Sequence, residues 1–120
     1  MKIIIIEDDL KIREELSKLL KKNGYETILL NEFENIPLQI ENIDANLILL
    51  DINLPFENGY EICRKIKNIS NIPIIFVTSR DSTQDEIMSI QVGGIDFISK
   101  PYDTIILLEK IKRAISENYG

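Results

Sequence analysis

The sequence predicts one α/β domain in which a doubly wound parallel sheet of five strands carries helices on both faces. Three observations lead to this fold class. Strand-like and helix-like segments alternate five times along the 120 residues, the strand-like segments are continuous apolar runs, and the connections are only a few residues long. Continuous apolar strands separated by amphipathic helices are typical of a parallel sheet that is buried on both sides.

Five short apolar segments rich in β-branched residues are the expected strands. They cover residues 2–7, 25–30, 46–51, 74–79 and 96–99. The first segment, KIIIIE, runs straight into the acids Glu7, Asp8 and Asp9, and the third, NLILLD, also ends in a carboxylate. Because neither segment alternates apolar with polar residues, we expect both sides of each strand to be buried.

Apolar residues at helical spacing predict a helix after each strand. The expected apolar faces consist of Ile12, Leu16, Leu19 and Leu20; Ile62, Cys63, Ile66 and Ile69; Ile87 and Ile90; and Leu107, Leu108, Ile111 and Ile115. The first and fourth helices end at glycine-containing stops, Asn23-Gly24 and Gly93-Gly94, and the last helix covers residues 103–117. The second helix is expected over residues 33–42, although Pro37 inside it removes a backbone donor.

Composition excludes several classes of protein. No apolar run approaches the roughly 20 residues of a membrane span, and no charged-then-apolar leader is present. Cys63 is the only cysteine, which excludes a disulfide framework and a cysteine zinc site and suits a reducing cytoplasm. The net charge of −6 argues against direct contact with nucleic acid. The absence of histidine excludes histidine-based catalysis and metal binding.

We expect residues 1–120 to form a single domain, because this length suffices for one hydrophobic core and the chain contains no linker, repeat or low-complexity segment. The chain stops just after the fifth expected helix. Any output domain is therefore expected to be absent from this chain.

Polar side chains collect where the expected strands end. The strand ends carry Glu7-Asp8-Asp9, Asp51, Thr78-Ser79 and Lys100. Taken singly, each has an ordinary explanation, because an acid often caps a helix and a lysine is often a solvated charge. In a parallel sheet, however, all these strand ends meet at one edge, which is where open α/β sheets bind ligands.

The joint pattern at that edge favours a cation site. Three carboxylates brought together would repel one another unless a cation lies among them. Because the available ligands are oxygens, Mg²⁺ suits the site better than zinc, with Mn²⁺ as a substitute. A hydroxyl at Thr78 and an ammonium at Lys100 beside such a metal form a pocket for an anion, and a phosphoryl group fits it best.

At these residues the sequence resembles the response-regulator receiver domains of two-component signalling. The resemblance rests on IIIIEDD, LILLDINLPFENGYEIC, PIIFVTSRD and GGIDFISKPY, which occur in order and span essentially the whole chain. It implies a flavodoxin-like fold with strand order 2-1-3-4-5. It also implies a signalling switch rather than an enzyme, with a sensor histidine kinase as the partner that donates the phosphoryl group.

The resemblance further implies a role for each polar residue at the edge. Asp51 would be the phosphoacceptor, and Glu7 and Asp8 would hold Mg²⁺ together with Asp51 and the backbone carbonyl of Asn53. Thr78 and Phe97 would be the switch residues, and Lys100, joined to Pro101 by a cis bond, would pair with the phosphate. Asn53 and Arg80 would set the lifetime of the acyl phosphate.

Within the family, the chain is most similar to the OmpR/PhoB class, whose output domain is a DNA-binding winged helix. The segment TSRDSTQDEIMSIQVGGIDFISKPY is similar to regulators of peptide-antibiotic resistance transporters in low-GC Gram-positive bacteria. The resemblance implies a phosphorylation-dependent homodimer through the fourth helix, fifth strand and fifth helix.

Two departures on that dimer face put its usual salt bridges in doubt. Ile95 follows Gly94 where the class has Ala-Asp, and Ile106 stands where the class often has a glutamate. Asp96 with Lys110 or Arg113 remains a candidate pair across the interface, and the alternative is that these are simply solvated charges.

Three other functions compete with this interpretation. A phosphatase of the haloacid-dehalogenase kind needs a second acid two residues after its nucleophile, where this chain has Asn53. A nucleotide-binding domain is disfavoured because neither glycine-rich phosphate motif occurs. A receiver that serves only as a docking module stays open, although every residue that phosphoryl transfer needs is present.

Overall fold

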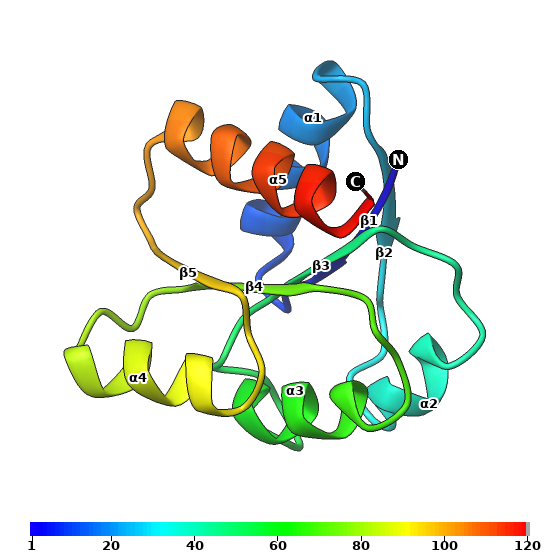
Figure 1. The fold of residues 1–120 in the computed structure, drawn as a ribbon, viewed down its shortest axis with the longest axis vertical. Coiled ribbons are helices and arrows are strands. Elements are labelled where there is room, and N and C mark those ends of the chain that lie inside the picture. Colours follow the sequence, from blue (N-terminus) through cyan, green and yellow to red (C-terminus); the bar gives the residue numbers. More distant parts are fainter. Residues whose placement is uncertain (120) are drawn as a thin grey trace.

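The computed structural model describes residues 1–119, with side chains up to residue 117. The strands β1 (Lys2–Ile6), β2 (Glu26–Leu29), β3 (Leu47–Leu50), β4 (Ile74–Thr78) and β5 (Asp96–Ser99) form one sheet (Figure 1). All neighbouring strands pair in parallel, in the order β2-β1-β3-β4-β5. Both the predicted fold class and the predicted strand order are confirmed.

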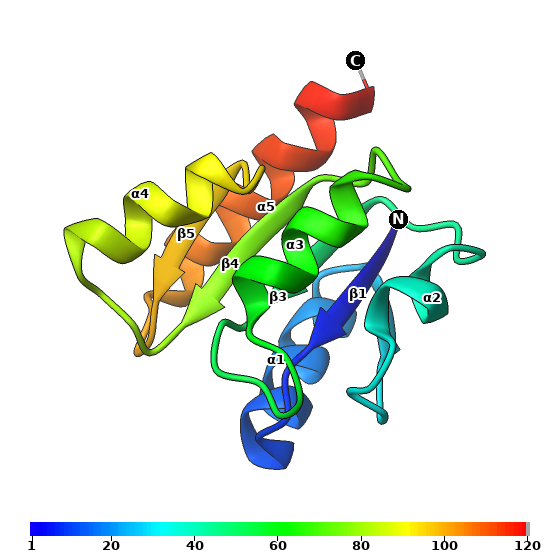
Figure 2. The ribbon, with the colours of Figure 1, turned by 90° about the horizontal axis from the view of Figure 1, so that it is seen from below.

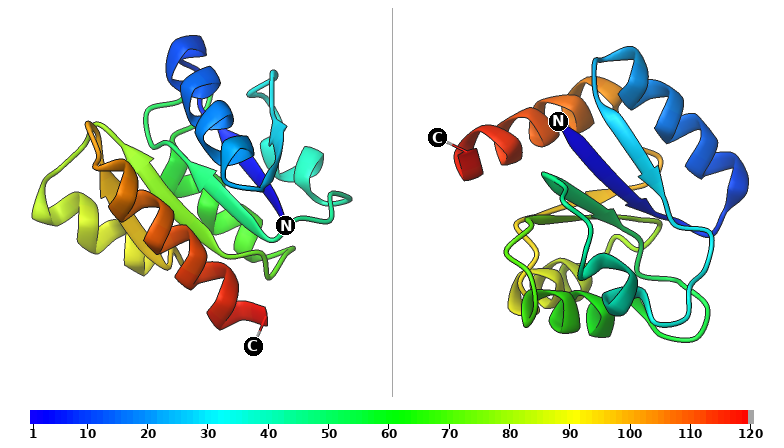
Figure 3. Two further views of the ribbon diagram at one scale, coloured as in Figure 1. Left: turned by 90° about the horizontal axis from the view of Figure 1, so that it is seen from above. Right: turned by 90° about the vertical axis from the view of Figure 1, so that its right-hand side faces the viewer.

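Five helices cover the two faces of the sheet: α1 (Leu10–Lys22), α2 (Ile36–Ile40), α3 (Gly59–Lys67), α4 (Thr83–Gln91) and α5 (Thr104–Tyr119). Helices α1 and α5 lie on one face, and α2, α3 and α4 lie on the other (Figures 1 and 3). Figure 2 shows the second face, with α3 and α4 side by side across β4. Among the described residues, none of the helices combines the length and the hydrophobicity that a membrane span requires.

Adjacent residues of each central strand enter opposite halves of the core. Ile4 and Ile48 pack into the cluster under α2, α3 and α4, whereas Ile3 and Leu49 pack into the cluster under α1 and α5. Both clusters exclude water almost completely. The continuous apolar runs in the sequence therefore reflect a sheet that is covered on both faces.

The sole cysteine belongs to this core. Cys63 on α3 is fully buried, and burial raises the pKa of its thiol to about 11. At neutral pH the thiol is therefore protonated and unreactive.

The predictions for the second and third helices need correction. The second helix covers only Ile36–Ile40 instead of residues 33–42, because Pro37 occupies its first turn, where a missing N–H costs nothing. Asn35 before it has a left-handed backbone (φ 56°), which ends any helical path from upstream. Ile69 lies beyond the end of α3 at Lys67, so it is 45% exposed instead of lying on the buried face.

Helix α4 exists as predicted, but its apolar residues do not face the core. Ile87 is 48% exposed and Ile90 is 63% exposed, whereas the buried residue of the helix is Ser89. The Ser89 hydroxyl donates to the backbone carbonyl of Glu86 (2.6 Å), so its hydrogen bond is made within the helix. Helix α4 therefore turns an apolar side to solvent.

Candidate functional site

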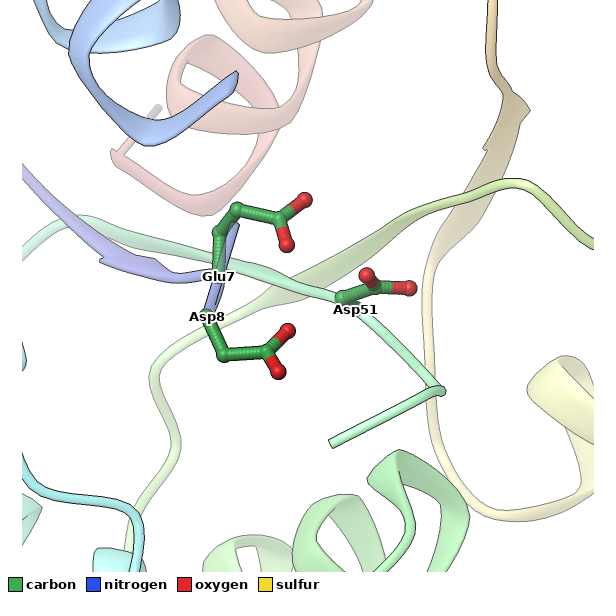
Figure 4. A group of neighbouring side chains, drawn as sticks. All are labelled: Glu7, Asp8 and Asp51. Carbon is green, nitrogen blue, oxygen red and sulfur yellow. The ribbon is translucent and has the colours of Figure 1, made fainter. Parts of the chain in front are cut away.

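Three carboxylates meet at the carboxyl edge of the sheet, beside the point where the strand order reverses. Glu7 and Asp8 follow β1, and Asp51 follows β3, the neighbouring strand. One oxygen from each of the three groups lies within 4.8 Å of the others, and the carboxylates of Glu7 and Asp8 extend toward the side on which Asp51 lies (Figure 4). The register of two parallel strands thus brings together residues that are more than 40 positions apart.

Lys100 links two of these acids. Its ammonium donates to Oε1 of Glu7 and to Oδ2 of Asp51 (3.2 Å). The second oxygen of Glu7 accepts from the backbone N–H of Asp9 (3.1 Å). Burial raises the pKa of Glu7 even though the Lys100 hydrogen bond opposes the shift. Burial also disfavours the charge on Lys100, but the hydrogen bond to Glu7 and the charge of Asp51 outweigh it and raise the pKa of Lys100.

Asp51 is held in a defined orientation by backbone donors. Its Oδ1 accepts from the N–H of Ile52 (2.7 Å) and of Asn53 (3.4 Å), while its Oδ2 faces Lys100. Asp51 and Glu7 are buried, whereas Asp8 is exposed. The acid cluster is therefore open to solvent on the side of Asp8.

The donor set fits a divalent oxygen-loving cation. Three carboxylates against one ammonium leave two negative charges of the cluster uncompensated. Carboxylate and carbonyl oxygens are the ligands that Mg²⁺ prefers. The described cluster therefore matches Mg²⁺ in both charge and ligand type.

Thr78 and Arg80 occupy the next strand end. Thr78 is fully buried at the end of β4, and its Oγ1 accepts from the backbone N–H of Arg80 (3.3 Å). The Arg80 side chain reaches back to the Asp51 loop, where its Nε donates to Oδ1 of Asn53 (2.9 Å). The amide of Asn53 also donates to Oγ of Ser79 (3.4 Å). The structure thus brings the two predicted lifetime residues into direct contact.

The remaining predicted residues lie on β5 and α5, away from the acids. Phe97 is partly buried and packs against the core cluster under α3 and α4. Lys110 donates to Oδ1 of Asp96 in the same chain (3.1 Å), and Arg113 pairs with Glu117 of its own helix (3.2 Å). Within one chain, therefore, Asp96 already has a partner in Lys110, and Arg113 does not contact it.

Two functional candidates were missed by sequence reasoning. Tyr60 on α3 donates to Oδ1 of Asp85 at the start of α4 (2.6 Å), and Asp85 also pairs with Arg80 (3.4 Å). The only signal in the sequence was the Ser82-x-x-Asp85 spacing, which is typical of a helix N-terminus and identifies a cap but no contact with Tyr60.

A hollow of about 540 Å³, lined in part by Lys100, lies between α1 and the loop before α5. Its lining is mainly apolar, with Ile12 and Leu19 from α1 and Pro101 and Tyr102 from the loop. The three acids do not line it, so this hollow neighbours the candidate site without forming part of it.

Comparison with known proteins gives consistent matches over the whole domain. Residues 3–112 match the response regulator receiver domain family. The uncharacterized transcriptional regulatory protein YvcP of Bacillus subtilis (strain 168) is 40% identical over 119 residues, which are 99% of this chain and 50% of that protein. The chain thus spans about half the length of the curated relatives it matches.

Solved structures agree with these matches. A two-component response regulator from Clostridium difficile is 28% identical, with a TM-score of 0.93 over 100% of this chain and 99% of that one. The N-terminal domain of the nisin resistance regulator NsrR, a lantibiotic response regulator, is 34% identical, with a TM-score of 0.84 over 95% of this chain and 97% of that one.

Proposed function

This chain belongs to the response regulator receiver domain family, and we propose that it is a phosphorylation-dependent switch that accepts a phosphoryl group on Asp51. One observation carries the proposal. Glu7, Asp8 and Lys100 converge on Asp51 at the carboxyl edge of the sheet, with oxygens of the three acids within 4.8 Å of one another. A structural role alone does not require this concentration of charge, because burying like charges together costs free energy.

Glu7, Asp8 and Asp51, together with the backbone carbonyl of Asn53, would hold Mg²⁺, and Mn²⁺ would serve as a substitute. When bound, the cation supplies positive charge that offsets the acids and the oxygens of the incoming group. The excess of two negative charges in the cluster and its opening beside exposed Asp8 support this assignment.

The residues of the chain position and stabilise the transfer. A carboxylate oxygen of Asp51 attacks phosphorus, the bond from phosphorus to the donor atom breaks, and the donor leaves with that electron pair. Lys100 exchanges its contact with Asp51 for one with a phosphoryl oxygen, and the Ile52 N–H keeps the carboxylate oriented. Residues 1–120 contain no histidine, so the phosphoryl group comes from outside this domain, and a sensor histidine kinase is the donor that we propose.

Signal output follows from Thr78 and Phe97. Buried Thr78 would turn its hydroxyl toward the phosphoryl group, and the space it leaves would admit Phe97 more deeply. This movement changes the α4–β5–α5 face, defined here by exposed Ile87, Ile90, Ile95 and Ile106 with the Asp96–Lys110 pair. The exposed isoleucines support a homodimer that forms through this face after phosphorylation.

The full-length protein would use this dimer to regulate transcription. The relative YvcP is named as a transcriptional regulatory protein, and this chain spans 50% of it. We infer that residues 1–120 form the receiver domain on their own and that a DNA-binding output domain accompanies it in the full-length protein. The similarity to the nisin resistance regulator supports a role in the response to peptide antibiotics.

The competing phosphatase function lacks its proton donor. Position 53 is an asparagine whose Oδ1 already accepts from Arg80, so no carboxylic acid stands two residues after Asp51. We therefore do not favour it.

The proposal is tested by intact mass spectrometry after incubation with acetyl phosphate. We expect one added phosphoryl group in the presence of Mg²⁺, little or none with excess EDTA, and none in Asp51→Asn. Unchanged mass of the wild-type chain with Mg²⁺ would refute the proposal. Hydrolysis of a generic aryl phosphate with repeated turnover would instead revive the phosphatase.

A further inference from the structure

A hydrogen-bonded chain of side chains leads from the phosphoacceptor loop to the junction of α3 and α4. Arg80 donates from Nε to Asn53, two residues after Asp51, and from an Nη atom to Asp85 (2.9 and 3.4 Å). Asp85 in turn accepts from the hydroxyl of Tyr60 (2.6 Å). Neither Tyr60 nor Asp85 contacts the acid cluster, yet both are connected to it through one arginine.

Among these hydrogen-bonded side chains, Asp85 is held in place at the start of α4. Its Oδ2 accepts from the hydroxyl of Ser82 (2.6 Å), and its backbone N–H donates back to that hydroxyl (3.0 Å), which caps α4. The hydrogen bonds from Ser82 and Tyr60 lower the pKa of Asp85, and Arg80 adds to the effect. The carboxylate therefore stays charged at neutral pH and presents a constant partner to Arg80.

Tyr60 holds the carboxylate from the side of α3. Its ring is partly buried and lies 5.8 Å from the ring of Phe76, in a tilted arrangement, so the core fixes the position of the hydroxyl. Burial and the hydrogen bond to Asp85 raise the pKa of Tyr60 to about 12. The hydroxyl is thus a permanent donor under physiological conditions.

We propose that Tyr60 and Asp85 are positioning residues that hold Arg80 on Asn53 and thereby slow the hydrolysis of phosphorylated Asp51. This inference rests on the proposed function of Asp51. In hydrolysis, a water oxygen bonds to phosphorus while the bond from phosphorus to the Asp51 carboxylate breaks. The carboxylate regains its electron pair, inorganic phosphate leaves, and the water proton passes to solvent.

The position of Arg80 explains the direction of the effect. Asn53 lies two residues after Asp51, and the Arg80 Nε–H occupies its Oδ1, an acceptor that could otherwise orient a water molecule. Through this hydrogen bond the guanidinium links the loop that follows β3, which contains Asp51, to the loop that follows β4. Without Asp85 and Tyr60, the Arg80 side chain, which is 43% exposed, would leave this position part of the time and uncover both the acceptor and the phosphorus.

The test compares the half-lives of the acyl phosphate in Tyr60→Phe and Asp85→Asn. Each protein is phosphorylated with acetyl phosphate and Mg²⁺, freed of donor, and followed by intact mass. We expect both half-lives to shorten about fivefold, the factor associated with one ordinary hydrogen bond. The initial rate of phosphorylation by acetyl phosphate should stay at the wild-type value. Tyr25→Phe, which removes a hydroxyl on the other side of the sheet, and Glu61→Gln, which breaks an exposed pair with Arg64, are the matched controls and should not change the half-life.

A third pair of proteins separates positioning from a general loss of stability. In an Arg80→Ala background, Tyr60→Phe should change the half-life no further, because its effect passes through Arg80. Unchanged half-lives in both single variants, or a full Tyr60→Phe effect without Arg80, would overturn the inference. A wild-type chain that takes up no phosphoryl group would overturn the proposed function itself, which is a different outcome.

Discussion

Two regions of this molecule each pair a lysine with carboxylates, but in different surroundings. At the acid cluster, Lys100 is 12% exposed and Glu7 is 5% exposed; on the α4–β5–α5 face, Lys110 and Asp96 are 34% and 33% exposed. Around the first pair, backbone donors satisfy the remaining oxygens, whereas isoleucines around the second lie open to solvent. The chain thus fixes its acid cluster by itself, whereas the α4–β5–α5 face stays open to solvent, where we propose that a second copy of the chain binds.

The largest expected effect is the loss of stability when Lys100 is removed, compared with the loss when Lys110 is removed. Without Mg²⁺, Lys100→Met should lower the free energy of unfolding by about 3 kcal/mol, because it leaves buried acids uncompensated. Lys110→Met should cost less than about 1 kcal/mol, as solvent screens an exposed pair. Urea denaturation measures both, and Mg²⁺ should restore part of the loss only in Lys100→Met. Equal losses of stability in the two variants would show that the buried and the exposed lysine contribute alike.

Removing a metal ligand should separate binding from folding. Asp8→Asn should weaken Mg²⁺ binding by about tenfold or more, equivalent to about 1.4 kcal/mol. Its unfolding free energy without metal should not fall, because the substitution also removes repulsion from the cluster. Isothermal titration calorimetry measures the affinity, with Asp44→Asn, an exposed acid outside the cluster, as the control. Wild-type affinity in Asp8→Asn would contradict the assigned ligand set.

Substitutions on the α4–β5–α5 face should change dimerisation and leave the stability of the monomer unchanged. We expect a monomer that becomes a dimer with Mg²⁺ and beryllofluoride, whereas Asp51→Ala stays monomeric. Ile90→Asn and Ile106→Asn should weaken the dimer about tenfold each, since each removes roughly 1.5 kcal/mol of apolar burial. Their monomers should keep wild-type stability within about 0.5 kcal/mol. Analytical ultracentrifugation shows this, and identical sedimentation with and without beryllofluoride would rule out the coupling.

The smallest effect concerns Asp85, which stands between the two regions. Its pKa in the folded chain lies below the ordinary 3.8, chiefly because Ser82 and Tyr60 donate to it. The unfolded chain therefore binds the proton first, so the stability from Asp85 is present above that value and is lost as the pH falls through the folded pKa. The difference in unfolding free energy between wild type and Asp85→Asn should shrink on acidification. A constant difference from neutral pH down to about pH 3 would show that Asp85 is not held as described.

The acid cluster could be predicted from sequence because local signals were enough. Continuous apolar runs identify buried parallel strands, and parallel strands bring Glu7 and Asp51 to one edge whatever the details of packing. The link from Tyr60 to Asp85 could not be predicted in this way. It joins residues 25 positions apart on adjacent helices and depends on the distance between their axes, which periodicity does not encode.

The exposed regions were less predictable for a related reason. Ile87 and Ile90 look like core residues when burial is the only explanation for an apolar side chain, yet both lie open on α4. Likewise, the charges of Asp96 and Lys110 suit a contact within the chain as well as one between chains, and only the geometry shows that the first is made. Sequence patterns indicate that an apolar side chain prefers burial and that a charged one prefers an opposite charge. They do not say whether the same chain or another one provides that contact.

The most direct test of the account is to locate the phosphoryl group. The phosphorylated chain is reduced with borohydride, which converts an acyl phosphate into a stable alcohol, then digested and mapped by tandem mass spectrometry. We predict the reduced residue at position 51, dependent on Mg²⁺, with Glu7 and Asp8 unmodified. Modification at another residue, or at Asp51 to the same extent without a divalent cation, would show that the acid cluster is not a metal-assisted phosphoacceptor site.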